Sequence, residues 1–221
     1  MTKIDEFFKA QDLDDLLSIR REIQEVTEED ARKIVDVLDK WEDEQAVYNL
    51  LIHSSLIPEG HRIAAVDRAL FSREQPYFVL AAVVGLPGPD PGELPDSYHE
   101  KWLTRLLELV KTEEGVLGSR TSVTIAGWLE ERNYKRYLEV YPASNETASK
   151  NIISFALSKF GDLPRQEFND LLEEYQLDAS IRDQFLGEYD QYHAEIKEKG
   201  SSHRRWPLYS YIPNYVEFRT A

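Results

Sequence analysis

Two apolar helical stripes, separated by a very short connection, constrain the fold of this chain more than any other feature. The segment 97–113 has its large apolar residues at the i, i+3, i+4 and i+7 spacing of one buried helix face: Trp102, Leu103, Leu106, Leu107 and Val110. A second stripe with near-helical spacing follows in 116–132 and comprises Leu117, Val123, Ala126 and Leu129. Because Gly115 ends the first helix within so short a connection, we predict that the two helices pack as an antiparallel hairpin.

The same pattern extends over most of the chain. Further helices are predicted within 2–9, 12–24, 27–41, 43–56, 58–72, 134–141, 147–160, 164–175 and 179–199. The segment 76–86 is apolar on all sides, which fits either a buried helix or a hidden strand, and its helical neighbours favour helix. The fold class predicted is therefore all-α, an irregular array of antiparallel helical hairpins. It is either an α-solenoid or a bundle, because both bury the same stripes.

The end of the chain has a different character. After Gly200, the segment 201–221 contains two prolines and alternating bulky residues, which predicts a non-helical, extended and basic tail. We therefore expect one helical domain over 1–200 and a tail that either covers the helices or binds a partner. Arginine, tyrosine and tryptophan are favoured anchors at interfaces. The candidate partner-binding residues are Arg204, Arg205, Trp206, Tyr209 and Tyr211.

Negative charge is concentrated toward the two ends of the helical region. The formal net charge is −15, with −8 over 1–44, −2 over 45–161 and −8 over 162–198. Binding to nucleic acid depends on neutralising phosphates with Lys and Arg, so this balance disfavours it unless Arg204, Arg205 and the central basic residues share one face. The acidic ends either attract a basic protein or simply keep the chain soluble.

Some helical segments resemble the second helix of HEAT-type repeats, a basic residue followed by small and aliphatic positions that end in Ala-Leu. The matching segments are RIAAVDRAL at 62–70 and KNIISFAL at 150–157, with a weaker match that starts at Arg120. These segments begin 58 and 30 residues apart, whereas HEAT repeats recur at roughly 40 to 47 residues. The resemblance implies a curved stack of helical hairpins whose concave face binds another macromolecule.

The sequence shows no catalytic, cofactor-binding or metal-binding motif. It has no cysteine, which excludes disulfides and thiolate chemistry and fits a reducing, cytoplasmic compartment. The five histidines form no i, i+4 pair and no Glu-x-x-His motif. No apolar run reaches the roughly 18 residues that span a membrane, and the start does not resemble a secretory signal.

These observations favour a non-enzymatic protein-interaction module, either an adaptor or an acidic inhibitor or immunity-type protein that masks a basic partner. No cofactor is expected. The alternative is an enzyme on a helical scaffold whose dispersed site leaves no motif. A pocket that gathers His53, His99 and nearby carboxylates would favour that alternative.

Overall fold

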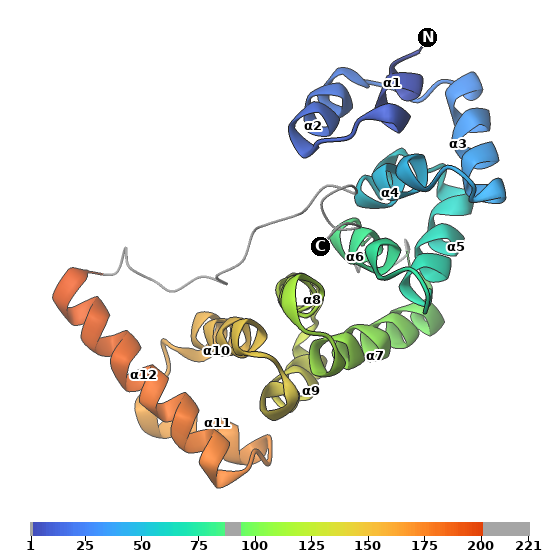
Figure 1. Ribbon diagram of the computed structural model, residues 1–221. Coiled ribbons are helices and arrows are strands. Elements are labelled where there is room, and N and C mark those ends of the chain that lie inside the picture. Colours follow the sequence, from blue (N-terminus) through green and yellow to red (C-terminus); the bar gives the residue numbers. More distant parts are fainter. Residues whose placement is uncertain (1, 87–93, 201–221) are drawn as a thin grey trace. The chain divides into compact units, whose positions relative to one another are not determined.

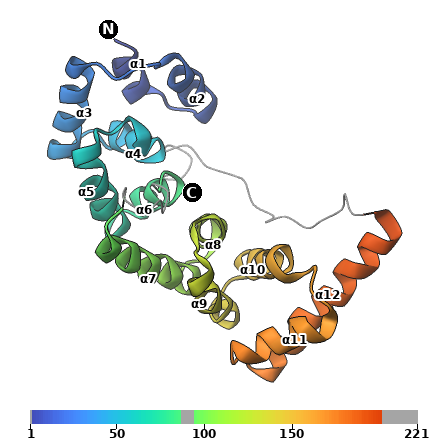
Figure 2. The same cartoon turned by 180° about the vertical axis from the view of Figure 1, so that it is seen from behind.

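The computed structural model describes residues 2–86 and 94–200. Within these ranges every regular element is an α-helix or a short 3-10 helix, and no strand occurs there (Figures 1 and 2). The predicted all-α fold is confirmed. The chain divides into two compact units, with the boundary between Arg105 and Leu106. The single domain predicted over 1–200 stays a prediction, and the predicted tail at 201–221 lies outside the described residues.

The first unit is built around one apolar helix on which two other helices pack. Its elements are α1 (Lys3–Lys9), α2 (Leu13–Glu22), α3 (Glu28–Lys40), α4 (Glu44–Ile52), the 3-10 helix η1 (Ser54–Leu56), α5 (Glu59–Leu70), α6 (Pro76–Val84) and the first part of α7 (Asp96–Thr112). In both views α4 lies beside α6, and α5 packs against α6 as well (Figures 1 and 2). Every residue from Phe78 to Val83 is buried, which explains why α6 has no polar face. The helix favoured for 76–86 is confirmed.

Gly85 allows α4 and α6 to approach closely. A Cβ atom placed on Gly85 would lie 1.8 Å from the carbonyl oxygen of Leu51 and 2.8 Å from that of Ile52. Both carbonyls belong to the last turn of α4. Because atoms cannot approach to these distances without displacement, only glycine fits at this end of α6.

The first four helices of this unit, α1 to α4, follow local capping rules at their starts, and the end of α3 is an exception. Side-chain oxygens of Thr2, Asp12, Thr27 and Asp43 accept hydrogen bonds from the first turns of α1, α2, α3 and α4. The exception is Trp41, which ends α3 in the left-handed region with φ 57°, a position that glycine usually takes. Its ring lies edge-on to Phe78, at 5.4 Å between centroids, and 4.2 Å from the Arg68 guanidinium. Tertiary packing thus holds a conformation that the sequence does not predict.

Asn49 fixes α1 on the buried side of α4. Its Nδ2 donates to the carbonyl oxygens of Phe7 at 2.9 Å and Ala10 at 3.0 Å. Its Oδ1 accepts from Gln45 Nε2 at 3.0 Å. Asn49 is buried, and these bonds supply partners for polar groups that would otherwise be costly to bury.

The second unit contains the rest of α7 and the helices that follow. These are α8 (Gly115–Trp128), the 3-10 helix η2 (Glu131–Asn133), α9 (Tyr134–Leu138), the 3-10 helix η3 (Tyr141–Ala143), α10 (Glu146–Phe160), α11 (Arg165–Glu174) and α12 (Ala179–Lys199). Helix α8 packs on α10, and α11 packs on α12. The helix predicted over 134–141 ends earlier than expected, at Leu138. Pro142 has no N–H to continue the helix, and it lies instead in the first turn of η3, where no N–H donor is needed.

The buried face of α8 differs from the predicted stripe. Leu117 is buried as expected, but Val123 and Ala126 are half-buried, and Leu129 lies just after the helix. The buried positions include Thr121 and Ser122. Ser122 Oγ donates to the Ser119 carbonyl at 2.7 Å and accepts from Asn151 Nδ2 at 2.8 Å. The predicted stripe is right for Leu117 and wrong for the other three positions, because the buried face continues through Ile125 and Trp128 and includes hydroxyl groups that are paired and therefore cost little to bury.

Candidate functional site

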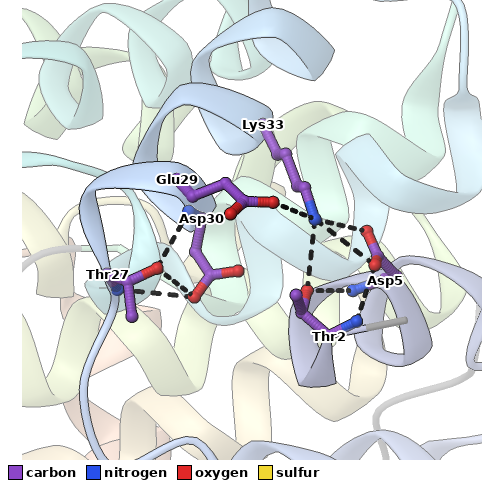
Figure 3. Close-up of polar contacts among 6 residues, drawn as sticks. All are labelled: Thr2, Asp5, Thr27, Glu29, Asp30 and Lys33. Atoms are coloured by element: carbon purple, nitrogen blue, oxygen red, sulfur yellow. Dashed lines mark hydrogen bonds and ion pairs between the residues drawn. The ribbon is translucent and has the colours of Figure 1, made fainter.

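The candidate site is the acidic surface, but some of its carboxylates are already bound by neighbouring side chains and amides of the fold. In Figure 3, Lys33 of α3 contacts Asp5 Oδ1 of α1 at 3.2 Å and Glu29 at 3.3 Å. Asp5 Oδ2 also accepts from the Thr2 amide at 2.7 Å. The Thr2 amide and then Lys33 hold the pKa of Asp5 below its usual value. Desolvation disfavours the charged form of Lys33, but hydrogen bonds to Asp5 and Glu29 outweigh this effect and raise the pKa of Lys33.

Asp30 is also structural. Its Oδ2 accepts from the Thr27 amide at 3.4 Å and from Thr27 Oγ1 at 2.7 Å, and its own amide donates to Thr27 Oγ1 at 3.2 Å (Figure 3). This is the reciprocal bonding of a capping box at the start of α3. Asp30 is buried, so its carboxylate is not presented to a partner.

Within residues 12–42, a second group of carboxylates is exposed and takes part in no ion pair with the described residues. We call it the amino-terminal acidic set: Asp12, Asp14, Asp15, Glu25, Asp39 and Glu42. Three of these lie together around the start of α2. Hydrogen bonding and charge repulsion from Asp12, with a smaller contribution from Asp14, raise the pKa of Asp15. This shift shows that negative charge is concentrated there.

The second unit contains a similar arrangement. Arg165 binds both carboxylate oxygens of Asp190, at 2.8 and 3.1 Å, and Arg182 pairs with Glu173. Other exposed carboxylates of α11 and α12 form no ion pair within the described part of the chain. We call them the carboxy-terminal acidic set: Glu167, Asp170, Glu174, Asp178, Asp183 and Glu198.

Three members of the carboxy-terminal acidic set share one face of α11. Glu167, Asp170 and Glu174 follow the i, i+3, i+7 spacing. The opposite side of the helix carries the buried residues Phe168 and Leu172. Packing of these two apolar side chains therefore orients the carboxylates toward solvent. Lys and Arg side chains of a partner would complement the charge of this face.

The histidines of the enzyme alternative occupy different structural positions. His53 ends α4, with its ring centroid 5.8 Å from that of Phe7. Burial, and then the charge of Arg20, lower its pKa to about 4. His99 is buried in the first turn of α7. No group of three or more His, Asp or Glu side chains that could hold a metal ion occurs in residues 2–86 or 94–200.

The predicted partner-binding residues Arg204, Arg205, Trp206, Tyr209 and Tyr211 all lie outside the described residues. Their predicted role therefore stays a prediction. In the part of the chain that the structure covers, no helix is both long and apolar enough to span a membrane. Comparison with protein-family models, with curated proteins and with solved structures gave no significant match.

Proposed function

We propose that this chain is a non-enzymatic protein-interaction module, an adaptor or inhibitor that binds a basic protein through its acidic sets. The observation that carries the proposal is that two groups of exposed carboxylates are left unpaired while neighbouring carboxylates are paired. The same surface disfavours nucleic acid as the partner. We include a cytoplasmic location in the proposal, because the chain has no cysteine.

We further propose that the helices are HEAT-like repeats. The two segments that carry the resemblance, 62–70 and 150–157, lie within α5 and α10. Each of these helices packs against another helix, α5 against α6 and α10 against α8. Pairs of packed helices are the building unit of such repeats.

The strength of the interaction would come from many weak contacts. A single exposed ion pair contributes about 0 to 1 kcal/mol, so no one carboxylate of the acidic sets should dominate affinity. The electrostatic field of each set should instead accelerate association with a basic partner. This field is screened by salt, because the Debye length falls from about 10 Å at 0.1 M to about 3 Å at 1 M.

The test is affinity capture from a lysate with the full chain, washed at about 0.1 M and at about 1 M salt. We expect a basic protein that is retained at low salt and released at high salt. Capture of partners that are acidic, or that stay bound equally at both salt concentrations, would contradict the electrostatic part of the proposal. Variants that neutralise chosen carboxylates of the acidic sets then assign the binding to particular residues.

A further inference from the structure

Two arginines of the first unit converge on one short segment without a carboxylate partner. Arg20, near the end of α2, places Nη2 3.5 Å from Ser55 Oγ in η1. Arg62, in α5, places Nη2 3.4 Å from the Ser55 carbonyl oxygen and 3.3 Å from that of Ile57. All hydrogen-bond acceptors that these two side chains contact among the described residues are neutral.

The two guanidinium groups have donors to spare. Each guanidinium carries five N–H donors. Arg20 uses Nη1 for the Ile23 carbonyl, at 3.2 Å, and Nη2 for Ser55. Arg62 uses only Nη2, and its buried Nε finds no hydrogen-bond partner in the described structure. Ser55 is exposed, and both arginines are half-buried, so this cluster lies at the surface of the first unit.

A histidine with no positive charge of its own lies beside these arginines. His53 precedes η1 directly, and its Nε2 is buried without a hydrogen-bond partner among the described residues. The charge of Arg20 helps to keep this imidazole neutral. Arg20 and Arg62 therefore supply the fixed charge, and two positive charges held near one hydroxyl group attract an anion.

We propose that Arg20, Arg62 and Ser55 form a binding site for a phosphate group. A phosphate monoester carries about −1.5 to −2 charges and three acceptor oxygens, which match two guanidinium groups and one hydroxyl. A carboxylate carries one charge and would leave the second arginine uncompensated. The phosphate group belongs either to a small molecule or to a phosphorylated side chain of another protein. The proposed phosphate site shares no residue with the acidic sets, so it does not rest on the proposed function.

The arginines also have a structural role, because Arg62 binds the carbonyls that end η1. A purely structural role predicts that phosphate does not bind, and that replacing Arg20 changes only stability. The two accounts therefore differ in a direct binding measurement.

The test is a titration of the isotope-labelled full chain with inorganic phosphate, followed by NMR, with total ionic strength kept constant by sodium chloride. We expect saturable shifts of the amides at 53–57 and of His53. Binding should weaken at least tenfold in Arg20→Gln and Arg62→Gln, and it should be unchanged in Arg73→Gln, which replaces an exposed arginine elsewhere in the same unit. If Arg62→Gln does not fold, Arg20→Gln and the conservative Arg20→Lys still decide the question.

Absence of saturable shifts, or equal shifts in Arg20→Gln and Arg73→Gln, would overturn the proposal. A second titration uses a phosphoserine peptide and its unphosphorylated form. Tighter binding of the phosphopeptide than of free phosphate identifies a phosphorylated protein as the source, and equal binding identifies a small phosphorylated molecule. Neither result depends on a basic partner, so failure here leaves the proposed function standing and can be told apart from its failure.

Discussion

Replacing Gly85 with alanine tests how closely α4 and α6 pack in the first unit. The new Cβ would lie 1.8 Å from the Leu51 carbonyl oxygen and 2.9 Å from the Ile52 carbonyl carbon. These atoms belong to the backbone and cannot rotate away as a flexible side chain does. The end of α6 therefore has to move, which also strains the hydrogen bond from Ser54 Oγ to the Gly85 carbonyl.

The expected magnitude follows from three contributions. Overpacking of a close contact costs about 1 to 3 kcal/mol, and weakening one hydrogen bond costs about 1 kcal/mol. Alanine offsets less than about 1 kcal/mol of this by restricting the unfolded chain. We expect the free energy of unfolding of Gly85→Ala to fall by about 1 to 4 kcal/mol.

The assay is urea denaturation followed by circular dichroism, with amide hydrogen exchange to localise the loss to α4 and α6. The matched control is Gly60→Ala in α5 of the same unit, where a Cβ would meet no atom within 4 Å. This control should be neutral or slightly more stable, by up to about 0.5 kcal/mol. Equal stability of the two variants would refute the close approach of α4 and α6.

Three further changes test other contacts of the first unit. Asn49→Leu leaves the carbonyls of Phe7 and Ala10 without their donor and should lower the free energy of unfolding by about 2 kcal/mol in urea denaturation. A loss below about 0.5 kcal/mol would contradict this account. Lys33→Met should lower the free energy of unfolding only slightly, because the pair with Asp5 is partly exposed. This loss should shrink at high salt, and a salt-independent loss would exclude an electrostatic cause. His53 has a pKa of about 4 in the folded chain against 6.5 for the ordinary side chain, so the unfolded chain binds the proton first and stability should fall as pH drops from 6.5 toward 4. His53→Gln should flatten this part of the stability curve, and an unchanged slope would count against the burial of His53.

Most helices of this fold are predictable from the sequence, because their signals are local. The cap at Thr27 and the i, i+3, i+4 stripe of α7 depend only on nearby residues. The uniformly apolar segment that forms α6 needed its helical neighbours as context. The left-handed Trp41 and the polar buried face of α8 depend on tertiary partners, such as Arg68 for Trp41 and Asn151 for Ser122. No sequence pattern reports such partners.

The candidate site was predictable only in part. The sequence shows that negative charge is concentrated at both ends of the helical region. It does not show that Lys33 neutralises Asp5, or that Asp12, Asp14 and Asp15 lack such a partner. That distinction depends on which helices pack together. The approach of Arg20 to Ser55 has the same origin, because the two residues are 35 positions apart in the sequence.

The most direct test of the central claim compares affinities for the captured basic partner between two variants of equal charge. Asp12→Asn, Asp14→Asn and Asp15→Asn together remove three charges from the amino-terminal acidic set. The control combines three substitutions at exposed acidic residues outside both sets: Glu59→Gln, Glu74→Gln and Glu114→Gln.

We predict that the first triple variant binds the partner at least tenfold more weakly than the original chain at about 0.1 M salt. This difference in affinity should largely disappear at about 1 M salt. The control should bind almost as well as the original chain. Equal weakening in both variants would mean that only net charge matters, and no weakening in either would contradict the proposed role of the acidic sets.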